Sequence, residues 1–227
     1  MSEIRLLDHG HVRLVDHMGS DLSIVRSARV SYNAQWRTGE DEGKDAKLIN
    51  YLVKNRHTTP FESVTFTFDV KAPIFVFRQW HRHRTWAYNE VSARYTELPE
   101  EFYVPEVEQI TTQSTSNKQM RTDEINPQAD FMRAIMKKQN ELAFQAYRDM
   151  LMLGCPRELA RSVLPVATYS QMFGTVNLHN LFHFLGLRTH SHAQHEIRVY
   201  AVAMLDLIRP IVPIAVAAWE EHYLSKK

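Results

Sequence analysis

The sequence predicts an α+β fold, in which a single domain of mixed helices contains a small, mainly antiparallel sheet. The length of 227 residues suits one large domain or two small ones, and 44% apolar residues are enough for a sizeable core. Long segments with helical spacing are separated by a few alternating segments, in no strict β-α-β rhythm. The chain has only seven glycines and no Gly-x-Gly-x-x-Gly after a strand, so a Rossmann-type dinucleotide domain is not expected.

The first half of the chain is expected to form strands at residues 4–7, 11–15 and 64–70 and helices at 22–28 and 45–55. The strand at 64–70 is the clearest of these, because apolar and polar residues alternate strictly through it. Asp21 is a candidate N-cap of the first helix, and the polar residues 33–45 are expected to be a loop. Thr59-Pro60 indicates a turn or a short helix, because the residue before a proline avoids helical geometry.

The second half is expected to contain a helix that starts at Pro73, strands at 102–105 and 168–176, helices at 128–153, 156–164 and 192–209, a helix capped by Asn177, and a last helix with Trp219. The longest helix begins after Asn126-Pro127 and stops at Gly154, which are typical start and stop signals. Its apolar residues form one stripe, at Phe131, Ile135, Leu142, Ala146, Met150 and Leu153. The helix capped by Asn177 is expected to break at Gly186-Leu187-Arg188.

Residues 106–126 are rich in Gln, Thr, Ser and Asn and carry few apolar groups. This composition predicts a mobile surface loop. Such a loop acts as a lid or a partner-facing segment in some proteins and is a tolerated insertion in others.

The cysteine count and the N-terminus indicate a cytoplasmic protein. Cys155 is the only cysteine, so no internal disulfide can form, and it is expected to be a small buried residue rather than a nucleophile. The first ten residues lack the apolar core of a signal peptide. No run approaches the roughly 18 apolar residues of a membrane span, so no membrane association is expected.

The segment Arg78–Tyr95 contains four arginines and two histidines, most of them in its first seven residues. Arginine presents planar, forked donors that suit phosphate or carboxylate and stays charged at any working pH. Asn89, Glu90 and Ser92 add acceptors and neutral donors, and a nucleotide with its sugar and base would use them. The alternatives are a solvated face and a nucleic-acid patch. The interleaved aromatic residues predict that the segment packs, and a formal charge of only +1 argues against a polymeric nucleic-acid partner.

The histidines raise a second hypothesis, a zinc or iron site in a nucleotide hydrolase. His179 and His183 share a helix face, and His190, His192 and His195 cluster just beyond them. The His-Asn-Leu-Phe-His sequence has no glutamate after its first histidine, which the zincin pattern requires. No cysteine pair or acidic cluster completes a ligand set, so no metal is expected.

Arg82-His83-Arg84, followed after seven residues by Ser92, resembles the signature of the flavin-dependent thymidylate synthases. Three further blocks are similar to that family in the same order, and the resemblance extends from Ala28 to the helix after Arg188. They are His57-Thr58-Thr59-Pro60-Phe61-Glu62, Pro156-Arg157-Glu158-Leu159-Ala160-Arg161 and the segment from Asn177 to Arg188. The chain departs from the family at Ala87, where serine is common, and at His179 and His183, where some relatives have arginine and asparagine.

The resemblance implies a homotetramer, with sites built from several subunits, that converts dUMP to dTMP. It implies methylenetetrahydrofolate as the carbon donor, NADPH as the reductant and FAD as the cofactor. The residues implied to bind dUMP are Gln79, Arg82, Glu90, Ser92, Ala93, Arg94, Arg161 and Arg188. Those implied to hold FAD are Ser31, His57, Thr59, Glu62, Arg82, His83, Arg84, Thr85, Asn89, Glu90, Asn177, His179, His183 and Leu187. His57 is expected near both flavin and folate.

Arg188 is the expected catalytic residue, facing the pyrimidine and the flavin, and its structural alternative is an ion pair with Glu196. Local alternatives also exist for Glu62, as part of a capping box on Thr59, and for Arg157 and Arg161, as surface salt-bridge partners. Ser92 is assigned to nucleotide binding, because no Ser-His-Asp framework is evident. Two rival classes remain open, a metal-dependent nucleotide hydrolase and a catalytically silent nucleotide-binding protein.

Overall fold

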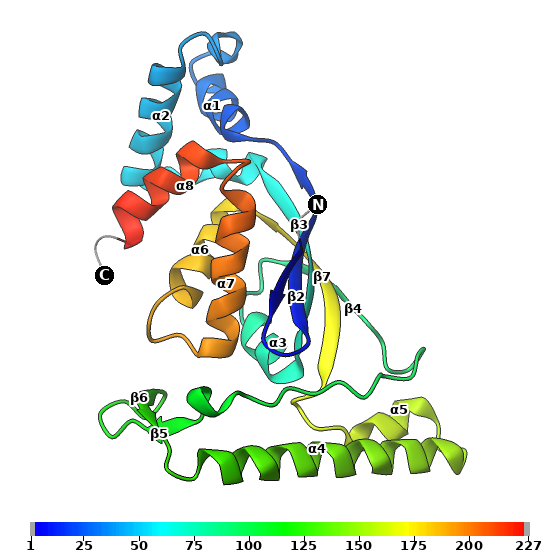
Figure 1. Cartoon of the computed structure of the whole chain (residues 1–227). Helices are drawn as coiled ribbons and strands as arrows, with labels where there is room; N and C mark the ends of the chain where they lie inside the picture. The colour runs from blue at the N-terminus through cyan, green and yellow to red at the C-terminus, as the bar shows by residue number, and fades with distance from the viewer. Residues whose placement is uncertain (1–2, 225–227) are drawn as a thin grey trace.

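A five-stranded sheet lies at the centre of the computed structural model, which describes residues 3–224 (Figure 1). Its strands are β1 (Glu3–Leu6), β2 (Gly10–Met18), β3 (Thr65–Pro73), β7 (Tyr169–Asn177) and β4 (Ala87–Glu90), in that spatial order. Every neighbouring pair in it is antiparallel, which confirms the predicted sheet type. The pairing of β3 with β7 runs from Thr65 opposite Asn177 to Pro73 opposite Tyr169.

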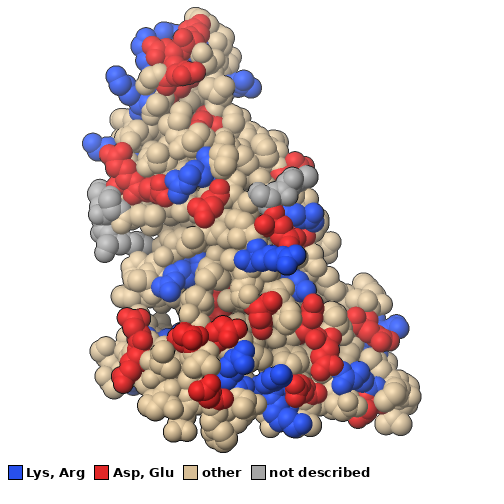
Figure 2. Space-filling view, in the orientation of Figure 1, with Lys and Arg blue, Asp and Glu red and all other residues tan. Residues whose placement is uncertain are grey.

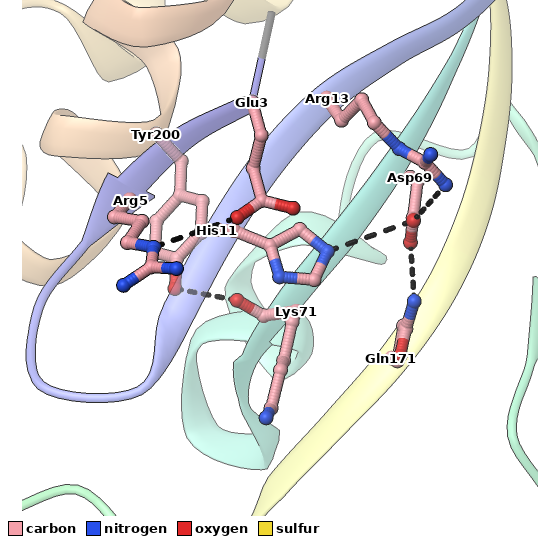
Figure 3. A network of polar contacts seen from close by, with 8 residues as sticks. All are labelled: Glu3, Arg5, His11, Arg13, Asp69, Lys71, Gln171 and Tyr200. Atoms are coloured by element: carbon pink, nitrogen blue, oxygen red, sulfur yellow. Dashed lines mark hydrogen bonds and ion pairs between the residues drawn. The ribbon is translucent and has the colours of Figure 1, made fainter.

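The alternation along β3 separates an apolar face of the sheet from a polar one. Phe66, Phe68 and Val70 are fully buried against the helices. On the other face, the buried carboxylate of Asp69 accepts hydrogen bonds from Arg13 on β2, at 2.9 Å, and from Gln171 on β7, at 2.7 Å (Figure 3). The central strand therefore joins both neighbours through side chains as well as through its backbone.

Six helices pack with the apolar face of the sheet into the main core: α1 (Asp21–Val30), α2 (Glu42–Lys54), α3 (Ile74–Trp80), α6 (Leu178–Arg188), α7 (His195–Ile208) and α8 (Pro213–Trp219). In Figure 1, α6 and α7 lie beside the sheet, and α1, α2 and α8 lie together at one end. Short helical turns lie at Gln35–Arg37, Thr59–Ser63, Val107–Gln109, Arg161–Val163 and Glu220–Leu224. The described chain is a single α+β domain, and no helix within it is long and apolar enough to cross a membrane.

The long helix α4 (Ala129–Met152) lies apart from the sheet, with α5 (Arg157–Ala160) at one end and the hairpin of β5 (Thr111–Gln113) and β6 (Arg121–Ile125) at the other (Figure 1). It buries Phe144 and Tyr147 in a small second cluster with Ala160, against which Cys155 is half-buried. The predicted apolar stripe faces outward instead: Phe131 is 64% exposed, Ile135 45% and Leu142 48%. The helix was correctly predicted, but its apolar stripe is not covered by any other part of the described chain.

Asp21 was wrongly predicted as the N-cap of α1. Ser20 holds that position, and Ser23 accepts a hydrogen bond from its backbone N–H. The Asp21 carboxylate is buried and accepts the backbone N–H groups of Ile214 at 2.9 Å and Ala215 at 3.0 Å. Asp21 therefore satisfies orphan donors in the first turn of α8, a helix almost two hundred residues away in the chain.

Four other expectations about the elements also differ from the structure. Gly186 does not break α6, which continues to Arg188, and the next helix begins at His195 rather than 192. The 106–126 loop contains the β5–β6 hairpin, in which Thr112 and Thr122 pair through their hydroxyls at 2.6 Å. The predicted strand at 102–105 is reduced to one bridge, between Phe102 and Thr168.

In the N-terminal half, α2 begins inside the predicted 33–45 loop, at Glu42, because Asp41 caps it. The segment predicted as a helix at 156–164 is α5 followed by a 3-10 turn. Strand β4 was not predicted, since its four residues Ala87–Glu90 are too few for an alternating pattern to be recognised.

Candidate active site

The cationic segment Arg78–Tyr95 is anchored by aromatic side chains, as predicted. Trp80 is fully buried and Trp86 is 7% exposed, and their rings meet edge to face at 5.7 Å. Tyr88 donates a hydrogen bond from its hydroxyl to the backbone oxygen of His83, at 2.9 Å. This packing fixes the backbone through the turn between α3 and β4. Tyr95, at the end of the segment, is 82% exposed and does not take part.

The last residue of α6 joins this segment to the other half of the chain. Arg188 donates from Nε to Nε2 of His83 at 3.0 Å and from Nη2 to the backbone oxygen of Gln79 at 3.1 Å. The expected alternative, an ion pair with Glu196, is wrong, because Glu196 pairs with Arg121 at 3.0 Å. Arg188 is therefore held by neutral acceptors, and its positive charge is not cancelled by a carboxylate among residues 3–224.

His83 is neutral in this arrangement. Burial, the positive charge of Arg188 and the neighbouring His183 lower the pKa of His83 from 6.5 to about 4. Because Arg188 donates to Nε2, the ring proton must lie on Nδ1. Burial also lowers the pKa of Arg188 from its ordinary value. A cationic guanidinium beside a desolvated neutral imidazole is suited to receive a ligand that carries negative charge.

A second group of predicted nucleotide-binding residues lies along β4 and the loop after it. Glu90 accepts a hydrogen bond from the hydroxyl of Ser170, at 2.7 Å. Ser92 Oγ accepts the backbone N–H of Arg94, at 3.3 Å, and within the described chain no hydrogen bond joins it to a histidine. Ser92 therefore lacks the paired base that a serine nucleophile needs.

Arg94 and Arg161 line one open surface cavity of about 540 Å³ with Glu158. Arg94 lies 3.4 Å from the Glu158 carboxylate, and Arg161 donates from Nε to the Glu158 backbone oxygen at 3.3 Å. Arg157 pairs with Glu97 at 3.4 Å, which confirms its salt-bridge interpretation. For Arg161 that interpretation is wrong in this structure, since no described carboxylate pairs with it and its guanidinium has donors left for an anion.

An apolar cleft of about 380 Å³ opens along α6, next to the segment that follows α2. Phe182 and Trp219 form one wall, stacked at 5.1 Å with their planes 5° apart. His179, His183 and Leu187 line the cleft from α6, as Arg56 and Thr58 do from the segment after α2. The structure thus places α6 beside the 57–62 block, of which Thr58 and Phe61 line the cleft, whereas its predicted flavin residues His57, Thr59 and Glu62 do not.

Most of the remaining predicted flavin residues are exposed on the surface. Arg82 and Arg84 are exposed, and neither makes a hydrogen bond or ion pair within residues 3–224. The exposed residues of this set are Ser31, His57, Thr59, Glu62, Thr85 and Asn89. Thr58, not Thr59, precedes the 3-10 turn, and it makes no side-chain cap bond, so the capping-box interpretation of Glu62 is wrong. Asn177 is engaged in capping α6, where it accepts the N–H of Asn180 at 2.9 Å.

The histidines do not assemble as a metal site. His190 and His192 have rings 4.6 Å apart, but in the described part of the chain no three His, Cys, Asp or Glu side chains form a group that would bind a metal.

On the face seen in Figure 2, basic and acidic residues are interspersed rather than gathered in a stripe of one sign.

Several site neighbours were missed by the sequence analysis. Gln194 accepts a hydrogen bond from the side chain of Gln79, and the buried Glu196 holds Gln194, Arg121 and Tyr103. The available signal was Glu196 itself, a charged residue next to Ile197 at the start of a mainly apolar helix. A charge at such a position requires a partner.

The fold and the site define an α+β protein with cations and hydrogen-bonding groups gathered beside an aromatic cleft. Residues 13–214 match the family model described as thymidylate synthase complementing protein, and the chain belongs to this family.

The chain is 49% identical to the flavin-dependent thymidylate synthase of Treponema denticola, over 97% of this chain and 82% of that relative. It is also 49% identical to the flavin-dependent thymidylate synthase of Thermus thermophilus, over 98% of this chain and 80% of the relative. Among solved structures it is similar to the UMP/dUMP methylase PolB from Streptomyces cacaoi bound with 5-Br dUMP. That likeness has a TM-score of 0.87 and 37% identity and covers 97% of this chain and 98% of the other.

Proposed function

We propose that this protein is a flavin-dependent thymidylate synthase, which converts dUMP to dTMP with methylenetetrahydrofolate as carbon donor and NADPH as reductant. The observation that carries the proposal is the double role of α6. Its last residue, Arg188, contacts His83 and Gln79 in the signature segment, while His179 and Leu187 on the same helix line the aromatic cleft. One rigid element thus places a cation for the nucleotide next to a flat apolar wall for a ring system.

The cleft fits part of a flavin. Its stacked Phe182 and Trp219 offer a flat apolar surface, and His179, His183 and Arg56 supply polar groups at its edge. The guanidinium groups of Arg82 and Arg84, which are exposed and unpaired among residues 3–224, suit the pyrophosphate of FAD. When bound, FAD supplies the hydride that the methyl product requires and that NADPH provides.

The nucleotide is assigned to the residues around Arg188 and β4. Arg94 and Arg161, at the open cavity beside Glu158, suit the phosphate of dUMP. Glu90 and Ser92 suit its 3′-hydroxyl, and Arg188 suits the pyrimidine. Negative charge builds on the carbonyl oxygens of a uracil ring as carbon 5 becomes nucleophilic, and a preorganised guanidinium stabilises that charge more than it stabilises the ground state.

Subunit assembly would complete this site. In one chain, Arg82 and Arg84 make no hydrogen bond or ion pair among residues 3–224, and the outer stripe of α4 exposes Phe131, Ile135 and Leu142. We propose a homotetramer in which these surfaces face other subunits. Light scattering of Ile135→Asp tests it: dissociation is the expected result, because a carboxylate in an apolar interface is costly to bury. An unchanged tetramer, or a monomeric wild-type protein, would contradict the proposal.

The function is tested by anaerobic oxidation of NADPH by the purified holoprotein, followed by addition of dUMP and methylenetetrahydrofolate. The expected results are yellow protein, FAD released on denaturation, bleaching by NADPH and formation of dTMP. If the protein cannot be reconstituted with FAD, it is not a flavin-dependent thymidylate synthase. A flavoprotein that binds dUMP but makes no dTMP would leave only a nucleotide-binding role.

A further inference from the structure

The carboxylate of Glu196 is buried close to the site but touches none of the residues assigned to substrate. The residue is 2% exposed. Its Oε1 accepts from Arg121 Nη2 at 3.0 Å and from the Tyr103 hydroxyl at 3.2 Å, and its Oε2 accepts from Gln194 Nε2 at 2.7 Å. Burial by itself would raise the pKa of Glu196, but the Arg121 charge and the hydrogen bonds from Gln194 and Arg121 hold that pKa below its ordinary value. Glu196 is therefore an ionised carboxylate.

An ionised carboxylate imposes a direction on the hydrogen bonds beyond it. It can only accept, so Gln194 must turn its NH₂ group toward Glu196 and its carbonyl oxygen away. That oxygen, Oε1, accepts from Nε2 of Gln79. The amide of Gln79 is thereby fixed as well, although a side-chain amide can otherwise turn over with little change in shape.

The fixed amide leaves Gln79 with an unused acceptor. Its Nε2 is directed to Gln194, and its backbone oxygen receives Arg188. Its Oε1 accepts no hydrogen bond from residues 3–224 and lies on a half-buried side chain, whose backbone oxygen receives the Arg188 cation. The site therefore presents the Oε1 acceptor at this position.

We propose that Glu196 and Gln194 are positioning residues that hold Gln79 as a hydrogen-bond acceptor and so select a nucleotide with a donor at that point. The inference rests on the proposed function, which places dUMP against Gln79 and Arg188. Two groups of dUMP can supply the donor, the imide N–H of the uracil ring and the 3′-hydroxyl of the sugar.

Replacing Glu196 by glutamine reverses this direction at nearly constant volume. In Glu196→Gln the side-chain oxygen still accepts from Arg121, but the new NH₂ donates toward Gln194. Gln194 then turns its carbonyl inward and its NH₂ toward Gln79, which must present its own NH₂ to the ligand. A donor on the nucleotide would meet another donor.

The experiment measures dissociation constants of the FAD-loaded protein for dUMP, for dCMP, which lacks the imide N–H, and for 2′,3′-dideoxyuridine monophosphate, which lacks the 3′-hydroxyl. Wild type is expected to prefer dUMP over the analogue that lacks the donor. Glu196→Gln is expected to reduce that preference by about tenfold, the scale of one hydrogen bond. The analogue whose preference changes identifies the donor.

Two further variants make the result interpretable. Gln194→Met keeps the buried charge of Glu196 but removes the amide that links Glu196 to Gln79, which we call the relay. This variant is expected to lose the preference for dUMP over the analogue without the donor, even if Glu196→Gln folds poorly. Glu220→Gln is the matched control, because Glu220 pairs with Arg209 at 2.8 Å on the surface and has no link to Gln79. It is expected to retain the wild-type ratios.

If the ratios of the dissociation constants for dUMP and its analogues are unchanged in both Glu196→Gln and Gln194→Met, the relay is overturned, while the thymidylate synthase proposal still stands. An equal loss of affinity for all three nucleotides would also overturn it, because general structural damage does not change selectivity. Wild-type protein that binds no dUMP would remove the basis for the relay and for the proposed function together.

Discussion

Arg188→Lys tests the assignment that matters most for the chemistry. The guanidinium uses two separate nitrogens, Nε toward His83 at 3.0 Å and Nη2 toward the backbone oxygen of Gln79 at 3.1 Å. Lysine keeps the charge but has a single terminal nitrogen, so it cannot hold both acceptors and still face a ligand. Losing one oriented donor in a preorganised site costs roughly 2.7–4 kcal/mol, or about 10²–10³ in turnover.

Two measurements separate the reaction at the pyrimidine from reduction of the cofactor: turnover with dUMP, and reduction of the bound flavin by NADPH. Turnover at saturating dUMP is expected to fall by about 10²-fold or more, while NADPH still reduces the bound flavin, because Arg188 acts on the pyrimidine. Arg209→Lys is the control, since its exposed pair with Glu220 contributes at most about 1 kcal/mol to stability and nothing to the site. Near-normal turnover with only a raised requirement for dUMP would show that Arg188 binds substrate and does nothing further. Loss of flavin reduction would place it at the cofactor instead.

Three further outcomes are expected. Ser92→Ala weakens dUMP binding by about one to two decades, the scale of a hydrogen bond to a charged group, but still forms dTMP at saturation. Wild-type protein loses about 2 kcal/mol of unfolding free energy between pH 7 and pH 5 through His83, because its folded pKa of about 4 lies below the unfolded 6.5 and the unfolded chain takes up the proton first. His83→Asn, measured by urea unfolding at the same pH values, lacks this component. Asp21→Ala lowers the unfolding free energy by about 1–2 kcal/mol, because two N–H groups of α8 lose their acceptor.

Each of these has a distinct contrary result. A Ser92→Ala protein that binds dUMP normally but makes no dTMP would reopen a nucleophilic role. Equal pH dependence in wild type and His83→Asn would show that the imidazole is not held neutral by the fold. An Asp21→Ala protein as stable as wild type, with Asp16→Ala as the exposed control, would mean that water or a rearranged turn satisfies α8.

Local signals in the sequence were enough to predict β3, α4 and the packing of the cationic segment. Strict alternation marks a strand with one buried face, and a proline at the start with a glycine at the end marks a long helix. Aromatic residues among the arginines implied burial, and Trp80 and Trp86 are indeed buried. These features depend on neighbours within a few residues, so they are readable without the fold.

The tertiary structure alone decided which groups meet. The contact of Arg188 with His83 joins residues 105 positions apart, and that of Asp21 with Ile214 spans 193. Helical periodicity identified the stripe at Phe131 and Ile135 but not the side that faces the rest of the chain, because both faces of α4 carry apolar groups. Side-chain partners depend on which segments the sheet and helices bring together, and spacing along the chain does not contain that information.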